Sequence, residues 1–245
     1  MPTPFSHLVQ AKRLLPRLPA EAQALISAHL PAFYLGNVAA DAKIEGQERA
    51  VTHFYRYDAP MPEHPWRVML ERHPSLARPH DPAWRVFTAG YVAHLATDAH
   101  WSRTMLGPYF ARGQWGKSAS WRFYVLHYLL IVMDERDEAL LNDADAQALA
   151  SCAAVDGLPF MPSATLSEWR DFIAEQIRGY SLTVPILAER VGVPAPHMRA
   201  LLDDPAQMQT MLWDHVPPQV LAQVEAGMDD HALDQLLCYL DESAP

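Results

Sequence analysis

The feature that most constrains this chain is the spacing of its apolar residues, which follows a helical period in one segment after another. Apolar residues that recur three and four positions apart form one face of an α-helix, whereas a half-buried strand needs strict alternation. Prolines are frequent (21) and glycines scarce (10), and the periodic segments lie between the prolines. The only arguable strand is Val51–Tyr57. We therefore expect an all-α protein that forms a multi-helix bundle.

Local signals set the expected helix boundaries. Pro19 precedes the first periodic run, and Asp81 followed by Pro82 is typical of a helix start. The longer helices are expected at Ala20–Leu35, Asp81–Met105, Ser118–Asp134, Asp137–Ala150 and Leu166–Tyr180. The shorter ones are expected at Thr183–Val191, Ala195–Leu202, Pro205–Trp213, Pro218–Ala226 and His231–Leu240.

Two of these helices carry a prediction about burial. The segment Ser118–Asp134 is apolar nearly all round, which is typical of a central buried helix. In the segment Asp137–Ala150, the spacing predicts that Leu140, Leu141 and Leu149 face inward.

The chain divides most naturally at the proline- and glycine-containing stretch Asp156–Ser163. Nearly all residues suited to chemistry precede this stretch. We expect a metal-binding helical core at residues 1–155 and a C-terminal helical cap or subdomain at residues 156–245, packed on the core. The loop-rich interval Arg56–Pro82 is expected to cover one end of the bundle.

Charge, cysteine content and hydropathy exclude several classes of protein. The 245 residues carry 19 Lys and Arg against 29 Asp and Glu, a net charge of −10, which argues against double-stranded nucleic acid or an anionic membrane as partner. The two cysteines, Cys152 and Cys238, form no disulfide framework or cysteine-based zinc site. The longest apolar run, Tyr124–Met133, is too short to cross a bilayer. No leader is recognised near the first residues, so the expected location is the cytoplasm.

A histidine and an aspartate stand four residues apart in the segment GYVAHLATDAHW. Residues at this spacing share one face of a helix, so His94 and Asp98 could bind one metal ion together. The neighbouring residues are apolar, and a buried charged carboxylate is costly unless it is paired or metal-bound. A hydrogen bond between His94 and Asp98 that only fixes helix packing is the alternative.

Four more residues could belong to the same site, although each has a simpler explanation. His7 lies near the start of the chain, Asp41 could cap a helix, His53 could lie in a surface loop, and His127 could be a buried core residue. Taken together they offer histidine nitrogen and carboxylate oxygen from separate helical segments. Such donors suit a borderline divalent metal ion, and helical bundles build metal sites in this way.

Three phrases of the sequence resemble one known family. FYLGNVAADAK, VTHFYRY and FTAGYVAHLATDAHW, in this order, are similar to stretches of the bacterial zinc-dependent phospholipase C family, which is related to the secreted phospholipases C and the zinc single-strand nucleases. The resemblance covers about residues 5–135. It implies an all-α bundle of the phospholipase C and zinc nuclease type, here with a C-terminal helical extension.

The resemblance also implies roles for single residues. Asp41, His53, His94 and Asp98 match the family's first zinc site, and Asp41 is in addition a candidate general base. His7 matches the early histidine that, in the family, binds a neighbouring metal ion together with the second oxygen of the aspartate, and His127 matches a helix histidine of a further zinc position.

The chain departs from the family pattern at its second site. The helix histidine of the family is followed four residues later by Glu, where this chain has Ile131, so that position would be lost or rebuilt from Asp134 or His100. Met1 precedes His7 by six residues, which leaves the family's amino-terminal ligand in doubt. We expect one zinc site, with a second left open; His/Asp sites also accept manganese, iron or nickel.

The favoured hypothesis is a metal-dependent hydrolase of phosphate esters, such as the phosphodiester of a lipid headgroup. A metal ion would bind a phosphate oxygen and activate water. Tyr34, Tyr55 and Trp101 are candidates for the pocket wall. The alternative is a non-catalytic helical protein with a residual or structural metal site, whose C-terminal helices bind a partner. A homodimer is compatible with either.

Overall fold

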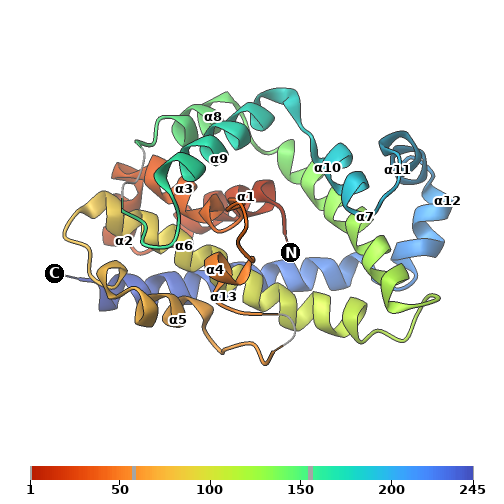
Figure 1. Ribbon diagram of the computed structural model, residues 1–245, viewed down its shortest axis with the longest axis horizontal. Coiled ribbons are helices and arrows are strands. Elements are labelled where there is room, and N and C mark those ends of the chain that lie inside the picture. Colours follow the sequence, from red (N-terminus) through yellow and green to blue (C-terminus); the bar gives the residue numbers. More distant parts are fainter. Residues whose placement is uncertain (1, 57–58, 154–156, 245) are drawn as a thin grey trace.

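The computed structural model describes residues 2–56, 59–153 and 157–244 and contains only helices and their connections within these residues (Figure 1). The all-α prediction is therefore confirmed. The α-helices are α1 Pro4–Leu14, α2 Ala20–Ala28, α3 Leu30–Ala39, α4 Ala50–His53, α5 Pro65–Arg72, α6 Pro82–Trp101, α7 Ala119–Glu138, α8 Asp143–Ala150, α9 Ser163–Glu175, α10 Thr183–Arg190, α11 Ala195–Leu202, α12 Pro205–Met208 and α13 Pro218–Glu242. Short 3-10 turns follow α1 and α5 at Leu15–Arg17 and Pro74–Leu76, and π-helical segments extend α6, α9 and α12 as Ser102–Ala111, Gln176–Tyr180 and Gln209–Trp213.

The segment considered as a strand begins with helix α4. Its last residue, Tyr57, lies outside the described residues.

The predicted single helix Ala20–Leu35 is wrong, because the chain breaks at His29 between α2 and α3. Pro31 stands in the first turn of α3. Proline has no N–H to donate to the preceding turn, and its ring clashes with the carbonyl four residues earlier. A helix can therefore start at this proline but cannot pass through it from α2.

The prediction of one helix over Asp137–Ala150 is also wrong. Asn142 forms a capping box with Asp145 and starts α8, so the chain turns between α7 and α8. Leu140 lies in this turn and is 55% exposed, whereas Leu141 and Leu149 are buried as expected.

Helix α7 is less buried than its composition predicted. Ser118 caps its start by accepting a hydrogen bond from the Trp121 N–H at 3.1 Å. Phe123, in its second turn, is 39% exposed, because this part of α7 faces a cavity described below.

Two short helices were predicted where the structure has one, α13. It runs antiparallel to α6 along most of the molecule (Figure 1). Arg85, near the start of α6, donates to the backbone oxygen of Leu240 at 2.5 Å, near the end of α13. Gly227 passes so close to His100 that a Cβ there would lie 2.6 Å from the His100 Nε2. This glycine therefore allows α13 to pack closely on α6, and the helix continues through it.

The crossing of α3 and α6 is tighter still and positions the site. A Cβ at Gly36 would lie 2.1 Å from the Phe87 carbonyl oxygen, and one at Gly90 would lie 2.4 Å from the Phe33 oxygen. The two glycines therefore let the backbones touch. One turn beyond Gly90 stands His94.

Buried apolar side chains form two clusters, and both α6 and α13 contribute to each. The first gathers α1, α3, α8 and α9, and the second gathers α7 and α10 to α12. The expected boundary between residues 155 and 156 lies at residues that the structure does not describe, and the division into core and cap stays a prediction. No helix within the described part of the chain has the length and apolar character needed to span a membrane.

Candidate metal centre

The structure brings five of the six predicted metal ligands together from four segments. His7 comes from α1, Asp41 follows α3, His53 ends α4, and His94 and Asp98 lie on α6. The side chains of His7, His94 and Asp98 are fully buried, and that of His53 is 1% exposed. Asp41, at 11%, is the most exposed of the five.

Asp98 lies at the middle of this cluster. Its Oδ2 is 3.3 Å from the Nε2 of both His53 and His94, and its Oδ1 is 3.4 Å from the Nε2 of His7. The Oδ1 of Asp41 is 3.4 Å from the same nitrogen of His53. Within the described residues, two groups of three offer ligand atoms within 4.8 Å of one another: His7, Asp41 and His94, and His53, His94 and Asp98. His94 belongs to both.

Hydrogen bonds on the outer side of the rings orient two of the histidines. The His94 Nδ1 donates to the backbone oxygen of Asn37 at 2.7 Å. The His53 Nδ1 lies 2.9 Å from the Thr52 hydroxyl oxygen and 3.3 Å from the Arg49 carbonyl oxygen. A proton on each Nδ1 leaves the Nε2 lone pair facing the cluster, which is the usual arrangement of metal-binding histidines.

The charges of the cluster favour a cation. Burial raises the pKa of the Asp98 carboxyl, but the charge of His94 and the neighbouring nitrogens of His53 and His7 outweigh it, so the pKa lies well below its usual range. Burial also opposes ionisation of Asp41, and the Arg49 guanidinium overcomes it and lowers that pKa. Burial lowers the pKa of His7, which keeps this ring neutral near pH 7.

Some buried polar atoms of the cluster lack a hydrogen-bond partner. These are both ring nitrogens of His7 and the Oδ1 of Asp98. Buried polar groups are rarely left unpaired, so these atoms need a partner, which a bound ion would supply. The donors are histidine nitrogen and carboxylate oxygen, which zinc accepts. The residues present therefore fit a zinc ion.

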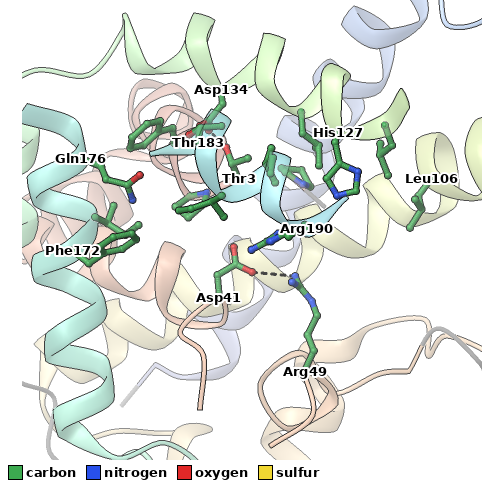
Figure 2. Close-up of a pocket in the computed structure, with 18 of the residues that line it drawn as sticks. Thr3, Asp41, Arg49, Leu106, His127, Asp134, Phe172, Gln176, Thr183 and Arg190 are labelled. Atoms are coloured by element: carbon green, nitrogen blue, oxygen red, sulfur yellow. Dashed lines mark hydrogen bonds and ion pairs between the residues drawn. The ribbon is translucent and has the colours of Figure 1, made fainter. Parts of the chain in front are cut away.

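A cavity of about 610 Å³ adjoins the cluster at Asp41, which is one of its lining residues (Figure 2). Asp41 and Arg49 line one side, and Thr3, Asp134 and Thr183 line another. The hydroxyls of Thr3 and Thr183 both donate to the Asp134 carboxyl. Most of the remaining lining is apolar and consists of Pro2, Pro4, Phe5, Leu106, Ala111, Phe123, Leu126, Leu130, Trp169, Phe172, Ile173, Ile186 and Leu187.

The sixth predicted ligand, His127, lies on α7 in the lining of this cavity and belongs to neither group. Its Nδ1 donates to the Phe123 carbonyl oxygen at 2.7 Å. Asp134, the proposed substitute ligand, bonds to the two threonines. His100, the other substitute, packs against α13 beside His231, with ring centroids 5.7 Å apart.

The three predicted pocket residues are not among the described lining of the cavity. Tyr34 is buried and donates to Asp145 at 3.1 Å. Tyr55 meets His53 edge to face, with ring centroids 6.3 Å apart. Trp101 is fully buried in the second apolar cluster.

Sequence reasoning missed the arginine of the cluster and the C-terminal wall of the cavity. Arg49 stands four residues before His53, a helical spacing that could have indicated it. Gln176, Thr183 and Arg190 line the cavity from the chain's C-terminal part, and no local signal distinguishes them from surface residues.

A comparison with known protein families identifies the family of the chain. Residues 3–152 match the family described as zinc dependent phospholipase C. The chain belongs to this family. The stretch matched by the zinc-dependent phospholipase C family contains all five residues of the cluster and His127, and the resemblance seen in the sequence is confirmed. Neither the curated proteins nor the solved structures provide a match.

Membership of the zinc-dependent phospholipase C family and the His/Asp groups together indicate a metal-dependent, phospholipase C-like hydrolase. The chain supplies donors that suit zinc, two negative carboxylates and an adjoining cavity with largely apolar walls. The cavity reaches the cluster through Asp41, which belongs to both.

Proposed function

We propose that the protein hydrolyses a phosphodiester of a lipid-like molecule, with zinc held by His53, His94, Asp98 and Asp41. The observation that carries the proposal is the position of Asp41, which lies in the His/Asp cluster and also lines the cavity. A polar end at the cluster and apolar walls beyond it match a substrate with a phosphate at one end and hydrocarbon at the other.

The chain's own residues would divide the work as follows. When bound, zinc polarises a phosphate oxygen and makes water more acidic. Asp41 lines the cavity and is ionised, because Arg49 lowers its pKa, so its carboxylate can hold zinc and orient the attacking water by accepting a hydrogen bond from it. His94 and His53 are held by Asn37 and by Thr52, which keeps their Nε2 atoms aimed at the ion. The apolar walls exclude bulk water.

His7 is the one residue of the cluster left to bind a second metal ion. This ring is stacked on His94, with centroids 3.9 Å apart, and its Nε2 faces the Oδ1 of Asp98. The alternative, a non-catalytic protein with a structural metal, draws support from His127, because it joins no group of ligands.

The test is hydrolysis of bis(p-nitrophenyl) phosphate and of phosphatidylcholine by zinc-loaded protein. We expect wild type to be active and Asp98→Ala to lose about 100-fold or more, because losing the central ligand removes the metal's stabilisation of the transition state. Asp143→Ala, which removes an exposed carboxylate at the start of α8, is the control and should retain activity. Equal activity in Asp98→Ala and wild type would contradict the proposal and favour the non-catalytic alternative.

A further inference from the structure

One residue of the cluster is a cation. Arg49 lies directly before α4, and its guanidinium reaches into the group of candidate ligands. Its Nη2 is 2.5 Å from the His53 Nε2, 3.0 Å from the Asp41 Oδ1 and 3.2 Å from the Asp98 Oδ2. This single nitrogen thus contacts three candidate metal ligands, through one atom of each.

Those contacts compete with a metal ion. Zinc binds histidine nitrogen and carboxylate oxygen at about 2.0–2.2 Å. The Nη2 of Arg49 already lies within hydrogen-bonding distance of three of these atoms, so it and a zinc ion cannot share the position. Their positive charges also repel each other in a buried site. Zinc and the Arg49 guanidinium therefore exclude each other at these atoms.

The space into which the Arg49 side chain can move is the cavity. Arg49 lines the cavity together with Asp41, and its side chain is 40% exposed, whereas Asp41 is 11% exposed and the rest of the cluster less (Figure 2). A guanidinium that turns a short distance from the cluster remains within the space where the substrate's phosphate would lie.

The charges of the zinc-loaded site indicate that the substrate's phosphate is the partner of the displaced guanidinium. Asp41 and Asp98 together neutralise one divalent ion, which leaves a phosphodiester's negative charge uncompensated. Among the described lining residues, only Arg49 and Arg190 carry a fixed positive charge, and Arg49 is the one in contact with the cluster. Arginine also matches the geometry of phosphate oxygens with two parallel N–H donors.

We propose that Arg49 is the phosphate-binding residue of this site, and that zinc binding moves its guanidinium from Asp41, His53 and Asp98 to the substrate's phosphate in the cavity. The inference rests on the proposed function, because it requires zinc at the cluster. It makes Arg49 a competitor of zinc in the absence of phosphate and a partner of phosphate once zinc is bound.

The experiment measures two dissociation constants, using zinc alone and inorganic phosphate as probes. Zinc affinity is measured without phosphate by competition with a chromophoric chelator, and phosphate affinity is measured by calorimetry on zinc-loaded protein. We expect Arg49→Gln to bind zinc about tenfold more tightly than wild type, because the hydrogen bonds of the guanidinium to the ligand atoms no longer compete with the ion. The variant should bind phosphate about tenfold more weakly, because a hydrogen bond from the guanidinium to the phosphate is lost. Arg49→Lys keeps the charge without the planar donors and should fall between the two in phosphate affinity.

Arg190→Gln is the matched control, because it removes the same charge from the same cavity at a residue that belongs to neither ligand group. Its zinc affinity should equal that of wild type. Weaker zinc binding in Arg49→Gln, or an unchanged phosphate affinity, would overturn the inference and leave Arg49 as an ion-pair partner that orders the loop before α4. If wild type binds zinc and hydrolyses the phosphodiester, such a result for Arg49→Gln would contradict this inference and still agree with the proposed function. Absence of zinc binding in wild type would contradict both the inference and the proposed function.

Discussion

At the scale of single residues, His94 links the two halves of the candidate site. It belongs to both candidate ligand groups, stacks on His7 and is held by Asn37. Its i, i+4 partner Asp98 is the one feature of the site that a helical spacing predicted directly. Removing this ring should therefore affect any metal that the cluster holds.

We expect His94→Ala to lose bound zinc, because both groups then lack one of their three ligands. His127→Ala is the comparison, since this ring lines the cavity and belongs to neither group. Plasma mass spectrometry of protein purified without a chelator or histidine tag measures the difference. Equal zinc in His94→Ala and wild type would exclude the cluster as the metal site.

A second residue, Asp134, should give the protein a pH-dependent stability. Burial raises the pKa of this carboxyl to about 7, against hydrogen bonds from Thr183 and Thr3 that lower it. The folded state then binds more protons than the unfolded state between about pH 4 and 7, so stability falls as the pH rises through this window.

Asp134→Asn should abolish that part of the pH dependence, because an amide does not titrate. Relative to wild type, the variant should gain stability steadily between about pH 4 and 7 and level off above, in urea unfolding at several pH values. The exposed Asp143→Asn should follow wild type throughout. A constant difference between Asp134→Asn and wild type would show that folding does not raise the pKa of Asp134.

At the scale of helices, the crossing of α3 and α6 decides whether the site exists. It joins the helix that ends before Asp41 to the helix that carries His94 and Asp98. The contact depends on Gly36 and Gly90, which both lie in the phrases that resemble the family but to which the sequence analysis gave no packing role. Local periodicity identifies which face of each helix is buried, but it contains no information on which two helices touch.

Gly36→Ala should destabilise the protein by about 2 kcal/mol or more, although alanine is intrinsically better in a helix by about 1 kcal/mol. The new methyl group would lie 2.1 Å from a backbone oxygen, which cannot move aside. Gly227→Ala is the control, because its neighbour is the end of the His100 side chain, which can rotate. Chemical denaturation compares the two, and equal costs would mean that the crossing tolerates a wider separation.

At the scale of the whole molecule, the candidate site connects α1, the end of α3, α4 and α6, which are distant in sequence. The ligands are brought together only in the folded chain, so zinc should bind the native state selectively and stabilise it. At a free zinc concentration of 100 times Kd the gain is about 2.7 kcal/mol, which corresponds to about 5–10 °C in Tm for a chain of this size.

Removal of zinc with a chelator should therefore lower Tm by that amount, and restoring zinc should recover it. His94→Ala provides the baseline, since its Tm should not respond to either treatment. A wild-type Tm that is indifferent to the chelator, in protein shown to contain zinc, would mean that the ion lies outside this cluster.

The sequence by itself determined the helical class, the position of most helices and five residues that meet in space. Helical periodicity, caps and the i, i+4 pair of His94 and Asp98 are local properties of the chain, whereas His7, Asp41 and His53 were assigned to the site through the resemblance to the family. The breaks at His29 and at Leu140 were missed, although Pro31 and Asn142 provided local signals for them. Only the tertiary structure placed Arg49 among the ligands, His127 outside them and α9 and α10 along the cavity. These depend on which helices pack together, and packing is governed by contacts between residues that are far apart in sequence.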